Sequence, residues 1–408
     1  MKKILALLLV AVMIVSFCAA CAKTEAPSTE TETSTTESTT TETTETTETT
    51  DTEEVPDAAT LVSDAFIDPL ADWSQYDELI AEIKAETDFA HRTELMHEAE
   101  DILMSNWCVL PFYYYNDIYM MKDYVTGMYA NLFGTKFFQE VKMTNGSDTL
   151  RANLASEPGY LDPALNSSVD GACLAAAAFS GLYTYNAEGK TEPACATGYT
   201  VSDDGLTYTV TLKDGLKWSD GQDLTASDFV FAWKRAASTA LGADYGYMFE
   251  GVKGYPDDLA VEATDDKTIV VTLNNALSYW DELLAFPAFF PVREDVVADE
   301  GWCTDAATFV SNGAYKMTGW DHNSVITLTK NDNYWDAENV TMQEIKFYLS
   351  DDANNMLTNF KNGDWLLIDD VPTNEIASLK EAYPTEFVVA GQIGTYYVCW
   401  NINKTLLP

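Results

Sequence analysis

Basic residues are scarce in this chain of 408 residues, where 23 lysines and arginines face 65 aspartates and glutamates. The formal net charge is -42. A chain this acidic repels the phosphates of nucleic acid and the headgroups of anionic lipid, so we expect no nucleic-acid partner. The excess of acid favours solubility and does not point to a specific cationic partner.

Histidine and paired cysteine are also rare. The three histidines, His91, His97 and His322, are too few and too scattered for a metal centre, and we expect each to be a surface side chain. Beyond residue 21 the chain has no Cys-x-x-Cys pair. A Cys173–Cys195 disulfide remains open in an oxidising compartment, but two buried thiols are favoured. We expect no metal site and no cofactor.

Catalytic motifs are missing as well. The sequence has no GxSxG, HExxH or P-loop motif and no GxGxxG after a predicted strand. Acidic pairs such as Asp203-Asp204 and Asp351-Asp352 are common by chance in so acidic a chain, and solvated turns explain them. The sequence therefore predicts a protein that is not an enzyme.

The one long apolar run lies at the start of the chain. Lys2 and Lys3 precede an apolar run over residues 4–15, which is too short to remain as a membrane span. We interpret residues 1–21 as a signal peptide. Residues 22–60 are rich in threonine and glutamate and cannot bury a core, so they predict a disordered tether.

Residues 200–237 carry the clearest local pattern. A turn at residues 203–205 leads into a strand over 207–212, where apolar residues alternate with threonine. Two Asp-Gly pairs then enclose a segment, residues 216–219, that we expect to be a short apolar strand. A helix follows, with Thr225 at its start and Asp228 three residues later in the position of a capping box.

Other segments predict further helices and strands. Leu79, Ile80 and Ile83 indicate one helix, and the apolar residues from Leu95 to Leu103 indicate a second. VLPFYYY, residues 109–115, is expected to be a buried strand. TLRANL predicts a strand, CLAAAAFSGLY a helix beginning at Cys173, residues 183–185 part of a β-pair, and residues 267–273 a strand.

These blocks resemble a known family. The stretch over residues 200–237 and the pieces NGAY, KNDNYWD and KNGD within residues 309–364 are similar to extracellular solute-binding proteins of family 5, the oligopeptide- and dipeptide-binding proteins of ABC importers. The resemblance implies an α/β (mixed α+β), bilobal periplasmic-binding-protein-like fold (type II, cluster C). It also implies a monomer that captures peptides in a cleft between lobes and delivers them to permease subunits.

Two other interpretations stay open. The same fold can bind another solute, such as nickel or a sugar, because a fold does not choose its ligand. An inactive, rearranged remnant acting only as a surface protein is the alternative from a different class.

The end of the signal peptide resembles the lipobox of bacterial lipoproteins. In Cys18-Ala19-Ala20-Cys21, the last cysteine would be diacylated, anchoring the protein to the outer face of the cell membrane. Ordinary cleavage with secretion is the alternative.

The order of the segments differs from that of the family. Residues 61–125 resemble the carboxy-terminal part of the second large lobe, yet they precede residues 126–180, which resemble the first lobe. Residues 181–300 would form the smaller subdomain and residues 301–390 the rest of the first lobe. Residues 391–408 would cross into the second large lobe, which remains incomplete here. A circular permutation joined through residues 145–147 is favoured slightly over a fusion of two gene pieces.

The resemblance also implies which residues bind the ligand. In the family, the segment after the LDP turn runs beside the ligand backbone, and it corresponds to three residues of this sequence. Tyrosines that line the family's cleft correspond to three more. The family's aspartate for the ligand amino group belongs to a stretch of the family that this sequence does not contain, so the resemblance assigns no residue to it. The implied ligand-binding residues are Ser167, Ser168, Val169, Tyr245, Tyr396 and Tyr397.

Overall fold

The computed structural model of the protein describes residues 73–106 and 109–399. The predicted signal peptide, the tether and the lipobox at Cys21 lie outside these ranges. Within them, no helix is both long enough and apolar enough to cross a membrane.

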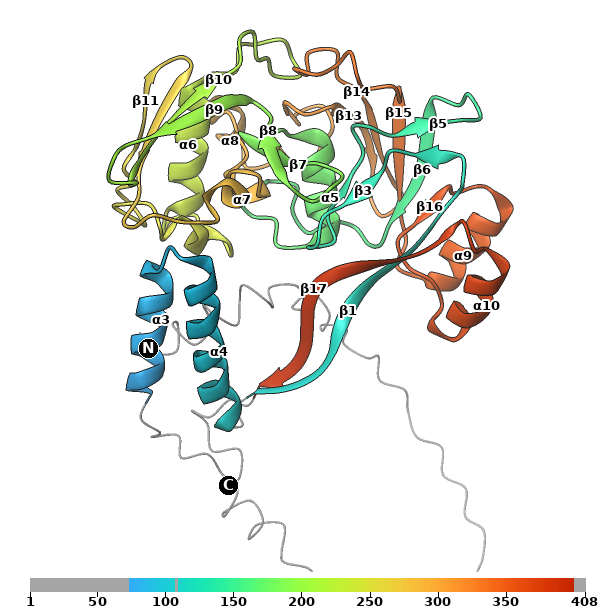
Figure 1. The fold of residues 1–408 in the computed structure, drawn as a ribbon. Coiled ribbons are helices and arrows are strands. Elements are labelled where there is room, and N and C mark those ends of the chain that lie inside the picture. Colours follow the sequence, from blue (N-terminus) through green and yellow to red (C-terminus); the bar gives the residue numbers. More distant parts are fainter. Residues whose placement is uncertain (1–72, 107–108, 400–408) are drawn as a thin grey trace, which may run out of the picture.

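A seven-stranded sheet forms the centre of the molecule, with the strand order β13-β14-β15-β6-β16-β1-β17 (Figure 1). The predicted strand TLRANL is β6, and it runs parallel to both of its neighbours. Strand β1 comes from the start of the described chain, yet it pairs antiparallel with β16 and β17 from its end. The bounds are β1 Val109–Met121, β6 Thr149–Leu154, β13 Tyr315–Asp321, β14 Val325–Lys330, β15 Glu344–Leu349, β16 Leu367–Ile368 and β17 Phe387–Cys399.

Helices α9 (Ala353–Asn362) and α10 (Ile376–Ala382) close one end of this sheet. Asp352 caps α9 by accepting the backbone N–H groups of Asn354 and Asn355. The apolar face of α9 packs on Met120 and Ile368, which ties β1 to β16.

Helix α5 (Val169–Ala178) lies beside short two-stranded pairs. The prediction that this helix begins at Cys173 and continues through SGLY was wrong at both ends. Ser168 caps it, because its Oγ accepts the Gly171 N–H at 3.1 Å. The helix ends at Ala178, whose carbonyl accepts the Gly313 N–H at 2.7 Å. The short strands are β2 Val125–Thr126, β3 Tyr129–Ala130, β4 Lys136–Phe137, β5 Lys142–Met143, β7 Tyr183–Tyr185 and β8 Thr191–Pro193.

A second unit, called here the four-stranded unit, consists of β9 to β12 and α6 (Ala226–Ala237). The predicted capping box is present, since the Asp228 carboxylate accepts the Thr225 N–H at 2.8 Å. Trp233 is buried in the face of α6 that packs on η2 (Pro287–Phe289). The remaining bounds are β9 Ala196–Val201, β10 Thr207–Leu212, β11 Val261–Asp265, β12 Thr268–Thr272, η1 Gly246–Phe249, α7 Trp280–Leu284 and α8 Glu294–Val297.

The segment between the two Asp-Gly pairs is not the apolar strand that the sequence predicted. It turns back on itself as a tight hairpin, with a single bridge between Lys217 and Asp223. The Trp218 N–H donates to the Gln222 carbonyl at 2.8 Å, across a turn where Gly221 has a φ of 90°. Two turns so close together leave too few residues for a strand.

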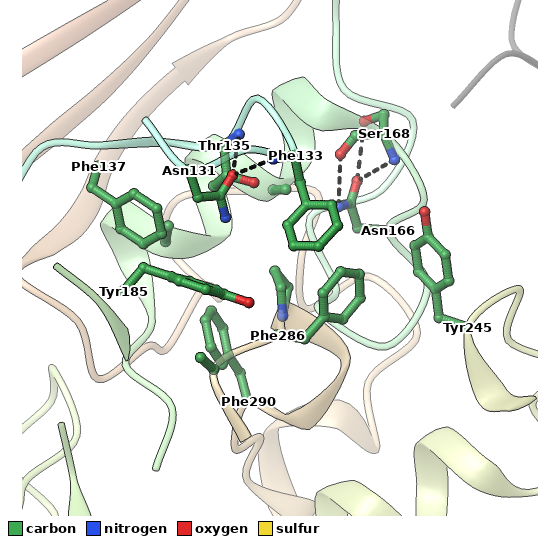
Figure 2. Close-up of a pocket in the computed structure, with 14 residues that line it drawn as sticks. Asn131, Phe133, Thr135, Phe137, Asn166, Ser168, Tyr185, Tyr245, Phe286 and Phe290 are labelled. Atoms are coloured by element: carbon green, nitrogen blue, oxygen red, sulfur yellow. Dashed lines mark hydrogen bonds between the residues drawn. The ribbon is translucent and has the colours of Figure 1, made fainter. Parts of the chain in front are cut away.

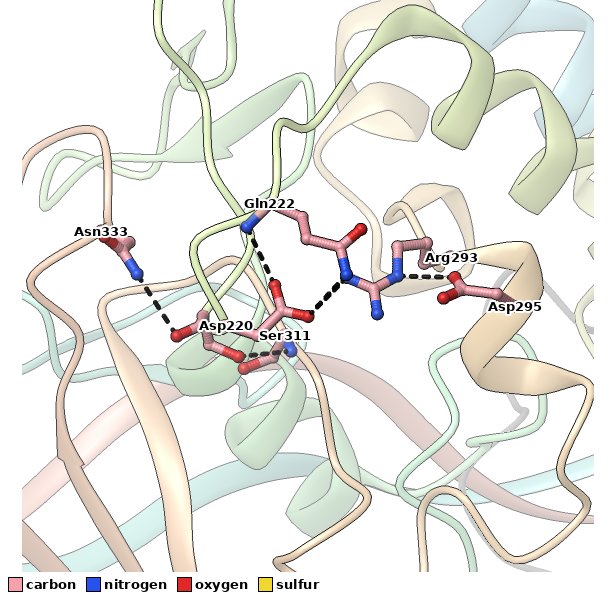
Figure 3. A network of polar contacts seen from close by, with 7 residues as sticks. Asp220, Gln222, Arg293, Asp295, Ser311 and Asn333 are labelled. Carbon is pink, nitrogen blue, oxygen red and sulfur yellow. Dashed lines mark hydrogen bonds and ion pairs between the residues drawn. The ribbon is translucent and has the colours of Figure 1, made fainter.

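Polar contacts join this hairpin to the loops of the larger sheet (Figure 3). The Ser219 N–H donates to the Ser311 carbonyl at 2.7 Å, and the Ser311 N–H donates back to Ser219 Oγ at 3.2 Å. Arg293 pairs with Asp220 at 2.7 Å and with Asp295 at 2.6 Å. The two serine bonds fix the four-stranded unit against the loops of the seven-stranded sheet, and the Arg293 pairs hold the hairpin to the start of α8.

The two predicted N-terminal helices are present as α3 (Ser74–Ala85) and α4 (Phe89–Ser105). We call this pair the helix hairpin. Its own small core includes Leu79, Ile80, Ile83 and Leu95, as the sequence predicted. Its tip meets the four-stranded unit through Lys84, which forms an ion pair with Glu250 at 3.0 Å.

Strand VLPFYYY exists, but the prediction that it is buried was wrong. Residues 109–117 of β1 pair only with residues 390–399 of β17, and together they form an antiparallel ribbon that leaves the sheet (Figure 1). Phe112, Tyr113 and Tyr114 are exposed. The reason is that the ribbon has only two strands, and no layer of described residues covers its faces.

Candidate functional site

A pocket lies where the β3–β4 turn, helix α5, strand β7 and the loop around η2 meet (Figure 2). It encloses only about 20 Å³, and about 470 Å³ when its opening to solvent is counted. Pockets that bind small ligands are usually mostly apolar with a few convergent polar groups. The lining residues are Asn131, Phe133, Thr135, Phe137, Asn166, Ser168, Ala172, Ala176, Tyr185, Tyr245, Ala285, Phe286, Pro287 and Phe290.

One wall is the turn between β3 and β4, which Asn131 holds in shape. Asn131 Oδ1 accepts the backbone N–H groups of Phe133 and Thr135, both at 3.0 Å. Gly134 completes the turn with a φ of 85°, a conformation that costs glycine little. The turn therefore projects the Phe133 ring over the pocket (Figure 2).

The opposite wall begins at the N-terminus of α5. Asn166 Nδ2 donates to the Ser168 carbonyl at 3.0 Å, and Asn166 Oδ1 accepts from Ser168 N at 3.2 Å and from its Oγ at 3.1 Å. Gly171 makes this packing possible, since a Cβ there would lie 1.9 Å from Asn166 Oδ1. The polar atoms of Asn166 are thus used within the wall.

Aromatic rings fill the rest of the lining. Tyr245 meets Phe286 edge-on with ring centroids 5.1 Å apart, and Phe137 lies 6.3 Å from Tyr185. Burial raises the pKa of both tyrosines, so their hydroxyls stay protonated at physiological pH. None of the lining residues carries a charge, and the pocket therefore favours an uncharged guest.

A buried charge cluster lies behind the β3–β4 turn. Lys136 Nζ is 3.2 Å from Asp117 and 2.5 Å from Asp369. Burial acts to lower the pKa of Lys136, but the two carboxylates outweigh it and the pKa is raised. Burial and the Asp369 charge raise the pKa of nearby Asp170 to about 6.

The four cysteines in the described ranges are free, so no Cys173–Cys195 disulfide forms. Both thiols are buried, as favoured from the sequence. Cys173 Sγ accepts the Lys136 backbone N–H at 3.2 Å, and burial raises the pKa of this thiol to about 12.

The structure brings only part of the predicted ligand set together. Ser168 and Tyr245 both line the pocket. Ser167 and Val169 are half-buried beside it, and Val169 is the first residue of α5, so its backbone is helical and not extended.

The other predicted tyrosines lie in the ribbon. Tyr396 stacks on Tyr113 with centroids 5.1 Å apart, and Tyr397 pairs in register with Pro111. Neither lines the pocket. The ribbon does contact the pocket wall, because the Ile393 N–H donates to the Leu132 carbonyl at 2.7 Å.

Sequence reasoning missed Asn131, Phe133, Tyr185 and Phe286. Each is an ordinary aromatic or turn residue in the sequence, and they converge only after the segments around residues 131, 185 and 286 pack together. The Asn-x-x-Gly pattern over residues 131–134 was the one available signal, because it is typical of a tight turn.

Comparison with known proteins places the chain among peptide-binding relatives. Oligopeptide-binding protein OppA of Bacillus subtilis is 39% identical over 256 residues, covering 59% of this chain and 47% of the relative. Dipeptide-binding protein DppE of the same organism is 34% identical over 270 residues, covering 64% and 49%. The chain thus spans about half the length of the curated relatives it matches.

Solved structures of peptide-binding proteins are also similar to this chain. The murein tripeptide-binding protein MppA of Escherichia coli superposes with a TM-score of 0.56 at 28% identity, covering 59% of this chain and 49% of that one. Listeria monocytogenes OppA bound to peptide gives 0.52 at 29% identity, covering 54% and 46%. These neighbours are bilobal, and the expected mixed α/β fold class is confirmed.

A sequence model described as bacterial extracellular solute-binding proteins, family 5 Middle, matches residues 190–407, which is more than half of the chain. Proteins of this family bind solutes and are not enzymes. The chain belongs to the family 5 bacterial extracellular solute-binding proteins.

Proposed function

We propose that this protein captures extracellular peptides and presents them to the permease of an ABC importer. The observation that carries the proposal is the uncharged, aromatic pocket lined by Ser168 and Tyr245, two residues that the family resemblance implies as ligand contacts. The names of the relatives support it, since several bind oligopeptides, dipeptides or a murein tripeptide.

A bound peptide would lie between the pocket and the ribbon. Extended peptides offer backbone donors and acceptors that strand edges can satisfy whatever their side chains. The ribbon carries such edges, together with Tyr396 and Tyr397 near the end of β17. Closure of the ribbon and helix hairpin over the ligand would follow the hinge motion of binding proteins.

A thermal-shift titration tests this proposal. A ligand that binds the folded state raises the melting temperature, by an amount that grows with its concentration relative to Kd. Mixed di- to octapeptide libraries should raise the melting temperature of the full chain. If a folded sample shows no shift with any library, peptide capture is wrong.

We also propose that Cys21 is lipidated and holds the protein at the outer face of the cell membrane. Two acyl chains suffice for stable anchoring. A Cys21→Ala variant should leave the membrane fraction of cells, and retention there would contradict the proposal.

The segment order is proposed to be permuted relative to the relatives. Residues 61–125 would supply part of the second large lobe and residues 391–408 its crossing strand, while residues 126–180, 181–300 and 301–390 would form the first lobe and its subdomain. The pairing of β1 with β17 supports this arrangement, because segments from opposite ends of the described chain become neighbours.

A further inference from the structure

We propose that Asn145 is a site of spontaneous modification, at which the folded chain reacts with water and the asparagine becomes aspartate or isoaspartate. The reacting groups are the side-chain amide of Asn145 and the backbone nitrogen of Gly146. This inference concerns the covalent chemistry of the chain and does not depend on peptide capture.

The reaction needs only these groups and water. The Gly146 nitrogen forms a bond to Cγ of Asn145, and the side-chain nitrogen leaves as ammonia, which carries away the proton of the Gly146 N–H. Water then opens the resulting cyclic imide at one of its carbonyl carbons. One opening gives aspartate, and the other gives isoaspartate, whose backbone runs through Cγ. Asparagine is among the thermolabile residues, and this chemistry accounts for that.

The sequence contains three Asn-Gly pairs, and the structure places them in different surroundings. The pairs are Asn145-Gly146, Asn312-Gly313 and Asn362-Gly363. Glycine favours the reaction in all of them, because it has no side chain to hinder its nitrogen and its backbone moves freely. The backbone must still rearrange until that nitrogen reaches Cγ. Local conformation and hydrogen bonds therefore decide which pair reacts.

The first pair lies in an exposed turn. Both residues are exposed, and a Cβ added at Gly146 would meet no atom of the described residues within 4 Å. Asn145 Oδ1 accepts the Ser147 N–H at 3.0 Å, and the Gly146 N–H donates to the Met143 carbonyl at 3.1 Å. Both bonds lie within the turn, so they open by local motion that leaves the sheet intact.

The second pair is buried and bonded on every side that the reaction needs. Asn312 is 3% exposed, its Nδ2 donates to the Ser180 carbonyl at 2.9 Å, and its Oδ1 accepts the Ser180 N–H at 3.1 Å. The Gly313 N–H donates to the Ala178 carbonyl at 2.7 Å. Attack would break all of these bonds within a packed interior, where no relaxed alternative is available.

The third pair ends a helix. Asn362 is exposed, but it is the last residue of α9. The Gly363 N–H donates to the carbonyls of Asn359 and Phe360, and Arg151 Nη2 donates to the Gly363 carbonyl at 2.9 Å. These bonds hold the Gly363 nitrogen in the helix cap. The last turn of α9 must therefore unwind before this nitrogen reaches Cγ.

Conversion of Asn145 should change the charge of the chain more than its fold. Aspartate keeps an oxygen that accepts the Ser147 N–H, and its carboxylate adds one negative charge at neutral pH. Isoaspartate adds a methylene group to the backbone between β5 and β6, in a turn with open space around it. The folded protein should therefore accumulate acidic forms with age.

The test compares the three pairs in one sample. The full chain is incubated in mildly alkaline buffer made with heavy-oxygen water, then digested and analysed by mass spectrometry, so that conversion in the folded chain carries the heavy oxygen. We expect Asn145 to convert at least about 10-fold faster than Asn312, since the loss of one or more hydrogen bonds accounts for such a factor. Asn145 should also convert faster than Asn362. In a chain unfolded by guanidinium the three should convert at similar rates.

Variants identify the source of the acidic forms. Isoelectric focusing of the aged chain should show a new acidic band, and Asn145→Ser should lack it. Asn362→Ser is the matched control, because it removes another exposed Asn-Gly pair and should retain the band.

Three outcomes would overturn the proposal. The first is a folded chain in which Asn145 converts no faster than Asn312 or Asn362. The second is a difference of the same size in the unfolded chain, which would assign it to the flanking residues and not to the fold. The third is an acidic band that persists in Asn145→Ser.

Discussion

Lys136, next to the pocket turn, is almost fully buried and charged. Only 2% of it is exposed, and its ammonium is the partner of two partly buried carboxylates, Asp117 and Asp369, whose side chains are 11% and 16% exposed. Its ammonium also lies 5.1 Å from the centroid of the Tyr119 ring. Removing one partner of a buried charge pair is costly because the others stay buried without compensation.

We therefore expect Lys136→Met to lower the free energy of unfolding by about 3–5 kcal/mol. Methionine fills a similar volume, so the loss reports the uncompensated carboxylates and not a cavity. Urea denaturation followed by circular dichroism measures it. Adding Asp117→Asn and Asp369→Asn to the variant should restore most of the loss. A triple variant no more stable than the single one would refute the electrostatic explanation.

Asp170 should make stability depend on pH. Burial and the Asp369 charge raise its pKa to about 6, although Lys136 acts in the opposite direction. An aspartate in the unfolded chain has a pKa of about 3.9, so between these values the folded state binds more protons. The unfolding free energy contributed by this group therefore falls as pH rises through that window.

Replacing Asp170 tests the direction of this pH dependence. Asp170→Asn should raise the free energy of unfolding by about 1–3 kcal/mol at about pH 7.5, and the difference should vanish near about pH 4. Denaturation curves of both proteins across this range measure it. A variant that is less stable at all pH values would show that the carboxylate stabilises α5 instead.

The sequence predicted individual residues of the site less well than helices and strands. Ser168 and Tyr245 were identified only through a family resemblance, and they do line the pocket. Asn131 and Tyr185 could not be found, because their role depends on which neighbours fold against them. Local sequence determines a turn or a cap, but not which distant side chains share a cavity.

Among the elements, the helix hairpin is held to the four-stranded unit by a few contacts at its tip. Lys84 pairs with Glu250, and Asn275 Nδ2 donates to the Lys84 carbonyl at 3.1 Å. The Arg92 guanidinium lies 5.0 Å from the centroid of the Tyr279 ring. A contact this small should open without unfolding the four-stranded unit, and the detached hairpin, with its small core, should then unfold readily.

Glu250→Ala with Asn275→Ala leaves the hairpin sequence intact and removes two of its docking contacts. We expect amide hydrogen exchange in α3 and α4 to rise by about 2- to 10-fold, in line with exposed ion pairs. Exchange in β10 and β12 should stay unchanged. Mass spectrometry after deuteration measures both.

Glu375→Ala is the control for the hairpin experiment. It removes another surface ion pair, with Lys361, and its side chain is 37% exposed against 44% for Glu250. It should leave exchange in the hairpin untouched. If it accelerates exchange there as well, the tip contacts do not hold the hairpin.

Helices and strands with strong local sequence patterns were predicted correctly. Features that depend on packing against distant segments, such as the burial of a strand, were not. The alternation in β10 and the capping box of α6 survive in the structure. VLPFYYY was correctly a strand but wrongly buried, because an apolar run does not reveal whether another layer covers it. The strand predicted around Trp218 was wrong for a related reason, because two nearby turns determine the backbone there in spite of the apolar residues.

Over the whole molecule, the seven-stranded sheet joins segments from both ends of the described chain. Strand β1 lies between β16 and β17, while the turn at residues 145–147 leads from its segment into β6. Gly146 in this turn has a φ of 83°, and a Cβ there would meet no atom within 4 Å. The turn is thus an open connection between two parts that the sheet already holds together.

Cutting this turn should not separate the parts. With a protease site inserted between Gly146 and Ser147, cleavage should give two bands on a denaturing gel and one peak on gel filtration. The pairing of β1 with β16 and β17 would hold the fragments together. Two separate peaks would show that the sheet cannot hold β1 without the covalent link. Insertion of the same site inside β12 is the control, because it should prevent folding.

The place of β1 in the sheet also bears on how a cell makes this protein. Translation releases Phe112 and Tyr114 early, whereas β17, the strand that pairs with them, emerges among the last residues of the described chain. Until β17 is synthesised, this aromatic segment is exposed and unpaired, and exposed unpaired strands promote aggregation. Export of the chain in an unfolded state, or a chaperone bound to this segment, would shield it until β17 has been synthesised.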